Sequence, residues 1–480
     1  IEYIIKKRWL VILAFFALCI ASIHTFKNSR VDAIPDIGEN QQIVFTEWPG
    51  RSPKDIEAQV TYPLSVSLSG ISGVRQIRAV SAFGFSTLYI IFDEDIDFYW
   101  SRSRILEKLS SASDVIPDNA TPKLGPDATG LGQVYWYTLE NENSSSHPRS
   151  LGEMRSIQDF YVRYKLQSVK GVSEVAGIGG FLQEYQVDMN PQKMQALDIE
   201  MNQIIESIKR SNLDIGAEII EEGGRERIVQ GIGFFEKIED IENVLIDVKG
   251  SRLVRVSDVA RVTIGPGLRR GALDKNGKEV VGGVVTMRHG ANPKEVVTAL
   301  KTTLKEIEAG LPKGIKLVPF YDRTEIIENT LSTVNKALSE EIIITLLVTM
   351  LFLVHFRSAI LIATILPFGV GISFIAMKFL DIDSNVMSLS GLVIAIGAMV
   401  DMGIIMTENI YSAISKNNPN NIGERMKIVA SSASEVAPAI LTAAATTIVT
   451  FIPVFGLEGA EGKLFTPLAW TKTLAMLGSV

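Results

Sequence analysis

Two carboxylates, Asp401 and Glu408, stand in an apolar run between Met387 and Asn409. An ionised Asp at the centre of a membrane-spanning helix costs about 2.5 to 3.5 kcal/mol on insertion scales. Such a group therefore needs a partner, a wet cavity or a proton. The run predicts an acid that takes up and releases protons at membrane depth, with a purely structural buried ion pair as the alternative.

Helical geometry places the two carboxylates on one face. We count about 100° per residue from Met399. Asp401 then falls at about 200°, Glu408 at about 180° and Gly397 at about 160°. A glycine on that face allows another helix to approach closely and bring a cation to the acid. We predict that Asp401 exchanges the coupling proton and that Glu408 shares this relay, a cap near the cytoplasmic interface being the alternative for Glu408.

Methionines form a second stripe on the same predicted helix. Met399, Met402 and Met406 fall at about 0°, 300° and 340°, nearly opposite the carboxylates. Thioether sulfur is a soft ligand that suits Cu(I) and Ag(I). A stripe of this kind on a spanning helix is more often packing or lipid contact, and Met387 lies about a third of a turn away. The stripe alone leaves both interpretations open.

Apolar runs that could cross a membrane stand at both ends of the sequence. The first extends from Trp9 to about Ile23 behind three basic residues, with a cleaved signal peptide as the alternative. Further runs lie at about 341–356, 358–377, 385–412 and 435–456. A sixth begins near Thr466, and its fifteen residues reach only about 22 Å of the roughly 30 Å hydrocarbon core. We therefore expect the native polypeptide to continue.

Basic residues predict the orientation of these runs. A cytoplasmic N-terminus places residues 27–338 outside and agrees with the positive-inside rule at each turn. A connection of about 310 residues is far too long for a loop. It is predicted to be a folded extracytoplasmic domain.

That domain has the pattern of a duplicated α+β unit. A strand, helix, strand, strand, helix order in residues 27–130 recurs in 131–338, where an insertion at about 190–270 interrupts it. We expect residues 1–26 to hold the first span and 339–480 to hold spans two to five and the start of the sixth. The predicted fold class is a polytopic α-helical membrane protein with an α+β porter domain of ferredoxin-like βαβ subdomains between spans one and two.

Composition excludes several classes of function. The net charge of −7 is spread through the middle of the chain, and no basic stripe suggests nucleic acid. The one cysteine, Cys19, allows neither a disulfide framework nor a cysteine-rich metal site. No phosphate loop and no nucleophile–base pair is recognisable, so we predict neither an enzyme nor a resident cofactor. Energy must come from an ion gradient or a separate subunit.

Several long motifs give the sequence a family resemblance. They are Val31–Asp36, Val60–Leu64, Ser101–Glu107, Leu124–Gly130, Arg269–Gly271, Tyr321–Arg323, Arg357–Ala359 and Gly397–Asp401. On these motifs the whole chain resembles the N-terminal half of heavy-metal-efflux members of the resistance-nodulation-cell division (RND) superfamily. The resemblance implies a homotrimer in the bacterial inner membrane, with a periplasmic adaptor and an outer-membrane channel as partners. We expect residues 190–270 to be the docking insertion.

The resemblance also implies roles for particular residues. Asp401 and Glu408 stand where the family has its relay carboxylates. Met387, Met399 and Met406 stand where copper/silver pumps place thioethers along a transmembrane metal path. The metal in that path is cargo, Cu(I) or Ag(I). The relay lysine and the methionines of the porter cleft are expected beyond residue 480.

Two positions bear on the choice of metal. Ala395 stands where divalent-metal members carry a further Asp, which favours the copper/silver pumps over the zinc/cobalt pumps, whereas Leu268 replaces an expected Met. We predict proton-driven efflux of Cu(I) or Ag(I). The alternatives are efflux of Zn, Co, Ni or Cd, export of amphiphilic drugs by a related pump, and, outside transport, a protein-export accessory factor or a sterol-sensing receptor.

Overall fold

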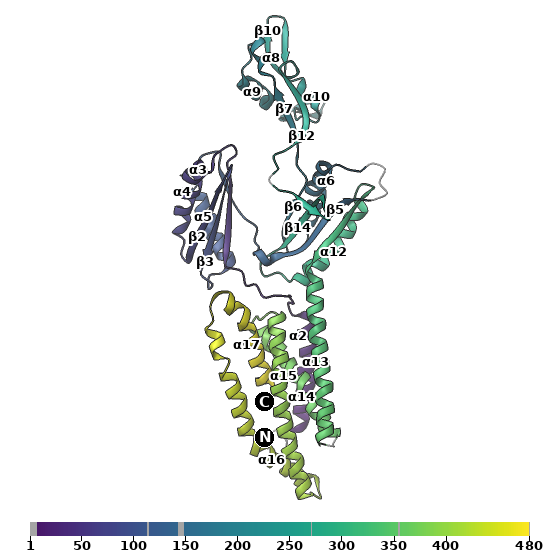
Figure 1. Ribbon diagram of the computed structural model, residues 1–480. Helices are drawn as coiled ribbons and strands as arrows, with labels where there is room; N and C mark the ends of the chain where they lie inside the picture. Colours follow the sequence, from purple (N-terminus) through teal and green to yellow (C-terminus); the bar gives the residue numbers. More distant parts are fainter. Residues whose placement is uncertain (1–6, 113–114, 143–147, 270, 354–355, 480) are drawn as a thin grey trace.

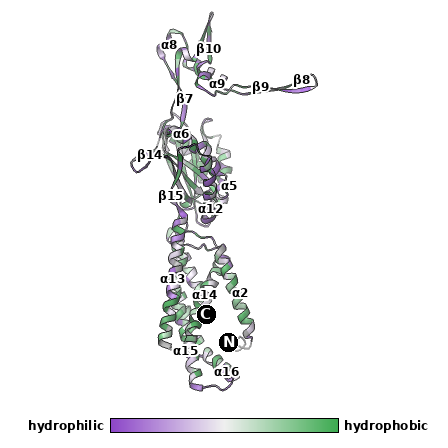
Figure 2. Cartoon of the chain, turned by 90° about the vertical axis from the view of Figure 1, so that its right-hand side faces the viewer, coloured by the Kyte–Doolittle hydropathy of each residue, from purple (hydrophilic) through white to green (hydrophobic). Residues whose placement is uncertain are grey.

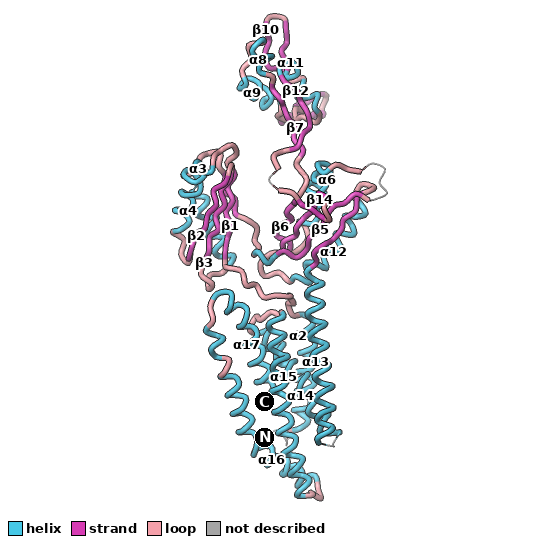
Figure 3. Tube along the Cα trace, in the orientation of Figure 1, coloured by secondary structure: helices cyan, strands magenta, loops and turns pink. Residues whose placement is uncertain are grey.

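The molecule is elongated and has three tiers (Figure 1). A computed structural model describes residues 7–112, 115–142, 148–269, 271–353 and 356–479. Long helices form one end, two α+β subdomains form the middle, and a smaller lobe forms the far end. Figure 3 shows that the strands are confined to the middle and the far end.

The first subdomain is a four-stranded antiparallel sheet covered by helices. Its elements are β1 (Gln41–Glu47), α3 (Pro53–Ile56), the π-helical turn η1 (Glu57–Thr61), α4 (Tyr62–Ser69), β2 (Val74–Ala82), β3 (Phe85–Phe92), α5 (Phe98–Ala112) and β4 (Thr121–Leu124). The strand order is β2-β3-β1-β4. Ser52 and Asp55 form a capping box that starts the first helix. Alternate residues of β1 and β3 are buried against Ile56, Leu64 and Ile105.

The second subdomain repeats this arrangement. Its elements are η3 (Gly130–Gly132), β5 (Gln133–Asn141), α6 (Leu151–Ile157), η4 (Gln158–Val162), α7 (Arg163–Gln167), β6 (Val172–Ile178), β13 (Leu273–Lys275), β14 (Lys278–Met287), α12 (Pro293–Gly310) and β15 (Ile315–Asp322). β14 pairs with β6 and β5, and β5 pairs with β15. The order β6-β14-β5-β15 matches that of the first subdomain, as the duplicated pattern in the sequence predicts. Its core packs Tyr137, Leu166 and Leu300 together.

An inserted lobe separates β6 from β14. Its elements are β7 (Gln183–Met189), α8 (Pro191–Ala196), α9 (Met201–Ser211), β8 (Ile215–Glu222), β9 (Arg225–Gly231), α10 (Ile238–Glu242), β10 (Leu245–Lys249), β11 (Arg252–Arg255), α11 (Val256–Val259) and β12 (Ala260–Pro266). β7 and β12 pair over their full lengths and carry the lobe away from the second subdomain. Figure 2 shows the β8–β9 hairpin projecting sideways from the lobe.

The remaining helices form a bundle below the subdomains. They are α2 (Arg8–Asn28), α13 (Arg323–Leu353), α14 (Phe356–Phe379), α15 (Val386–Asn417), α16 (Ile422–Val449), η5 (Ile452–Gly456) and α17 (Gly459–Ser479). Among the described residues, four segments are long and apolar enough to cross a membrane: Trp9–Phe26, Ser358–Phe379, Val386–Asn417 and Ile422–Gly456. Residues 341–353 of the predicted span belong to α13, which begins eighteen residues before position 341 because the helix follows directly from β15. Phe356 already belongs to α14, and positions 354–355 lie outside the described residues. Figure 2 shows the hydrophobic residues concentrated in this bundle.

Candidate functional site

Helix α15 carries all five residues that the sequence predicts for the site. Asn385 caps the helix, since its side chain accepts a hydrogen bond from the backbone of Ser388 at 2.9 Å. Asn418 ends it in the left-handed conformation. The 32 residues between them give a helix of about 48 Å. One rigid element therefore holds Met387, Asp401 and Glu408 in fixed relation.

The methionine face of α15 is closed. Met399 is fully buried and Met402 nearly so, in a cluster that α14 and α17 complete. A Cβ on Gly369 of α14 would lie 2.4 Å from the Met399 methyl group, so this glycine allows the thioether to approach the backbone of α14. Met406 is half-buried and packs against the same cluster. The predicted stripe is thus an interior face of the bundle.

Further methionines that the sequence analysis did not single out share this interior. Met377 of α14 and Met476 of α17 are buried in the same cluster as Met399 and Met402. The Ser479 hydroxyl lies 3.8 Å from the Met402 sulfur, and a thioether is a weak acceptor. Spacing within one helix could not reveal them, because they come from neighbouring helices. Met387 lies apart, half-buried in the first turn of α15.

The carboxylate face of α15 is open. Asp401, Glu408 and Gly397 are all exposed, as their predicted shared face requires. Within the described chain, neither carboxylate has a hydrogen bond or an ion pair, and a Cβ on Gly397 would meet no atom within 4 Å. The close helix approach that the glycine predicts is therefore not made by any described helix. Nearby, the Asn409 side chain donates to the Ser432 carbonyl of α16 at 2.9 Å and limits the open face on one side.

A lysine in the helix bundle was missed by the sequence analysis. Lys472 lies in α17, and its ammonium group is 3.9 Å from the centre of the Phe451 ring. An aromatic face is a partner for a cation where water is scarce. Lys472 thus has a partner that is not Asp401. The sequence could have revealed Lys472, because it is a charged residue inside the sixth apolar run. Groups of three or more His, Cys, Asp or Glu side chains that could hold a metal ion are absent from the described residues.

Known proteins are similar to this chain in sequence and in fold. A sequence model of the AcrB/AcrD/AcrF family matches residues 1–480. The chain belongs to the AcrB/AcrD/AcrF family. It is 38% identical over 491 residues to the cation efflux system protein CusA of Escherichia coli K12, covering 100% of this chain and 47% of that protein. It is 33% identical over 489 residues to the cation efflux system protein CzcA of Alcaligenes sp. strain CT14, again with full coverage of this chain and 46% of that protein.

Solved structures agree with this family. The crystal structure of a heavy metal efflux pump superimposes on 99% of this chain with a TM-score of 0.87 and 28% identity, and the match covers 46% of that pump. The chain thus spans about half the length of the relatives it matches. The resemblance to the heavy-metal-efflux branch of the RND superfamily is confirmed. As a member of the AcrB/AcrD/AcrF family, the chain is a multi-pass inner-membrane protein with its large domain in the periplasm.

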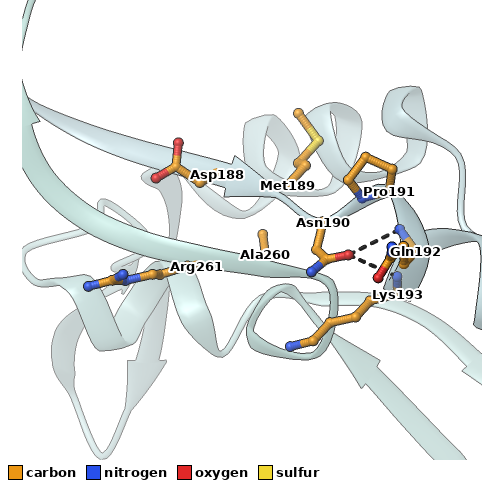
Figure 4. A pocket seen from close by; sticks show the side chains of 8 residues that line it. All are labelled: Asp188, Met189, Asn190, Pro191, Gln192, Lys193, Ala260 and Arg261. Carbon is orange, nitrogen blue, oxygen red and sulfur yellow. Dashed lines mark hydrogen bonds between the residues drawn. The ribbon is translucent and has the colours of Figure 1, made fainter.

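The inserted lobe carries a pocket beside the strands that connect it to the second subdomain. A pocket of about 620 Å³ on the lobe is lined by both strands of the β7–β12 pair and the start of α8 (Figure 4). Asn190 lies at its centre, and its side chain accepts from the backbones of Gln192 and Lys193. The Asn190 side-chain oxygen therefore serves to cap α8. Leu268, where the resemblance leads us to expect Met, follows β12 and is exposed.

Proposed function

We propose that this chain forms part of a proton-driven pump that exports heavy-metal cations across the inner membrane, with Cu(I) or Ag(I) as cargo. The observation that carries the proposal is the division of α15 into two faces. Buried thioethers occupy one face, and unpartnered carboxylates occupy the other. Soft sulfur ligands suit monovalent copper and silver. An acid at membrane depth suits the proton that drives them.

The two faces are coupled because one helix holds both. Gain or loss of a proton at Asp401 changes the charge that the open face presents to its surroundings. A helix that moves in response carries Met399 and Met402 with it. The closed face contacts α14 and α17, so the thioethers change position relative to Met377 and Met476. Exchange of a soft cation between sulfur atoms on different helices is the step that we assign to this motion.

The monovalent cargo is favoured by Ala395. This residue is fully buried between α15 and its neighbours. A carboxylate at this place, as the resemblance implies for divalent-metal pumps, would be buried among the apolar side chains of this cluster. The higher identity to CusA than to CzcA points in the same direction. Efflux of divalent cations remains the second candidate, and the experiment below separates the two.

The inserted lobe supports a proposal about partners. The β8–β9 hairpin and the segment after it expose large apolar side chains, among them Ile219, Ile228 and Ile232. A projecting strand pair with apolar residues and free edges is a surface that other protein chains cover. We infer a homotrimer that joins a periplasmic adaptor and an outer-membrane channel, with residues 190–270 as the docking insertion. We also propose the domain bounds of the chain. Residues 1–26 hold the first span, 27–130 and 131–338 form the two porter subdomains, and 339–480 hold the later spans.

Methionine replacement in the full-length pump tests the cargo. Met399→Leu with Met406→Leu keeps volume and apolarity while removing both sulfur atoms. We expect the tolerance of a metal-sensitive host for Ag⁺ to fall by about tenfold, because two soft ligands are lost. Met350→Leu is the matched control, since this methionine is exposed on α13 and outside the cluster. Undiminished Ag⁺ tolerance in the double variant would contradict the thioether path, and tolerance of Zn²⁺ alone in the unmodified protein would support the divalent cargo.

A further inference from the structure

The loop before α15 is hydrogen-bonded to the segment that follows α2. The Ser384 backbone donates to the Arg30 carbonyl at 3.0 Å and accepts from Asp32 at 2.9 Å, and Val386 donates to Ala33 at 3.1 Å. Val31 and Ser384 form an isolated parallel β-bridge. Ser384 is almost fully buried. The first turn of α15 therefore cannot shift along its axis without moving this segment, residues 30–33, which we call the collar.

A buried ion pair attaches the collar to α13. The Arg323 guanidinium donates to both Asp32 carboxylate oxygens, each at 2.8 Å, and to the Leu131 carbonyl. The Arg323 and Asp32 side chains are only 7% and 18% exposed. Burial raises the pKa of Asp32, and the guanidinium opposes that effect. A two-pronged pair of this kind fixes direction as well as distance. Removal of either partner leaves a buried polar group unsatisfied.

Arg323 also marks the place where the second subdomain becomes a helix. β15 ends at Asp322 and α13 begins at Arg323, with no residue between them. Ile327 of α13 packs against Val31 and Ala33 of the collar. β15 is hydrogen-bonded along its length to β5 of the second subdomain. A continuous path of bonded elements thus runs from α15 through the collar and Arg323 into that sheet.

Helix α17 is tied to the other subdomain. The Lys463 ammonium group in its first turns lies 2.6 Å from Glu94 and donates to the Gly38 carbonyl at 2.6 Å. Glu94 follows β3 of the first subdomain. α15 and α17 pack closely, since a Cβ on Gly391 would lie 2.5 Å from the Leu468 carbonyl oxygen. Two helices in direct contact are therefore attached to the periplasmic tier at different places. α17 is held to the first subdomain, and α15 reaches the second through the collar and Arg323.

We propose that Asp32 and Arg323 are positioning residues that transmit the displacement of α15 to the second subdomain, while Lys463 holds α17 to the first. A shift of α15 along α17 then moves one subdomain relative to the other. This inference rests on the proposed function, because Asp401 on α15 supplies the displacement. It assigns a role to two motifs, Val31–Asp36 and Tyr321–Arg323, that the site on α15 does not use.

Hydrogen exchange in the full-length protein tests the path without requiring transport. Asp401→Asn mimics the protonated acid, and its effect is measured at residues 384–386 and at β15. With the ion pair intact, we expect exchange to change by about threefold or more at both places, because bonded elements open together. In Arg323→Gln and in Asp32→Asn backgrounds, the change at 384–386 persists and the change at β15 is lost.

Two further variants make the result specific. Asp381→Asn removes an ion pair to Arg30 in which Asp381 is 87% exposed, so the response of β15 is expected to remain. Arg323→Lys keeps the positive charge but cannot donate two parallel hydrogen bonds to Asp32, so we expect a smaller change in exchange at β15. This variant replaces Arg323→Gln if the latter does not fold. A β15 response that persists in both ion-pair variants, or that is absent in the intact protein, overturns the proposal. Absence of metal-driven proton flux in the unmodified pump would instead contradict the proposed function and leave the exchange result valid.

Discussion

Asp322 and Asp401 are two carboxylates in opposite surroundings. Asp322 lies at the end of β15, where Lys301 contacts it at 2.5 Å and the Thr324 hydroxyl and backbone both donate to it. Burial opposes ionisation of Asp322, but these partners outweigh it and lower its pKa. Asp401 has no partner within the described chain. Asp322 thus has its partners within its own subdomain, and Asp401 does not have them on the described part of α15 and its neighbours.

This difference separates structure from transport. A partnered acid keeps one charge state and stabilises one conformation. An acid without a partner on a spanning helix must meet a cation, water or a proton from outside this set of contacts. The open face is therefore the part of the fold where the charge of a carboxylate can change during the transport cycle. On the closed face of the same helix a charge would be unfavourable, because apolar side chains surround that face.

The sharpest way to break the comparison is to place an acid on the closed face. Ala395→Asp puts a carboxylate into the buried cluster of α15. We expect a loss of about 3 to 4 kcal/mol of stability and little folded pump in the membrane, because the carboxylate would lose its hydration among apolar side chains. The measurement is the yield and thermal unfolding of the full-length protein. Ala395→Asn is the matched control for size, and equal behaviour of the two variants would show that charge is not the cause.

A smaller effect is expected at the satisfied acid. Because the pKa of Asp322 is lowered in the folded state, its contribution to stability is present above the unfolded pKa and is lost as pH falls through the folded pKa. Lys301→Met should cost about 1 kcal/mol at neutral pH, after allowance for solvent screening at the half-exposed lysine. The cost should persist down to the ordinary aspartate pKa of 3.8 and shrink only as pH falls below it. Urea unfolding of the full-length protein at neutral pH and at a pH well below 3.8 checks this, and a cost independent of pH would exclude the ion pair as its source.

Sequence patterns predicted most of the architecture because each pattern has a local cause. The strand, helix, strand, strand, helix order predicted for residues 27–130 is the order of β1, α3 to α4, β2, β3 and α5. The helical wheel of α15 separated buried Met399 from exposed Asp401. The first half of α13 was not predicted, because its residues are largely polar and an apolar run indicates only the part of a helix that lies in the membrane.

Contacts between distant segments could not be predicted in the same way. Val31–Asp36 and Tyr321–Arg323 stood out as motifs, yet 291 residues separate Asp32 from Arg323, and no spacing rule joins them. The same holds for Met476 of α17 beside the methionines of α15. Lys472 finds its ring partner only through the turn at η5. Local pattern gives elements and faces, and tertiary packing decides which faces meet.

Transport by an Asp401→Asn variant tests the central claim most directly. The full-length pump is placed in vesicles with an imposed proton gradient, and uptake of Ag⁺ and Zn²⁺ is followed together with internal pH. We expect the variant to fold and assemble like the unmodified protein, because Asp401 makes no hydrogen bond or ion pair within the described chain. We also expect it to move no metal against its gradient. Uphill metal transport that persists in Asp401→Asn would contradict the account.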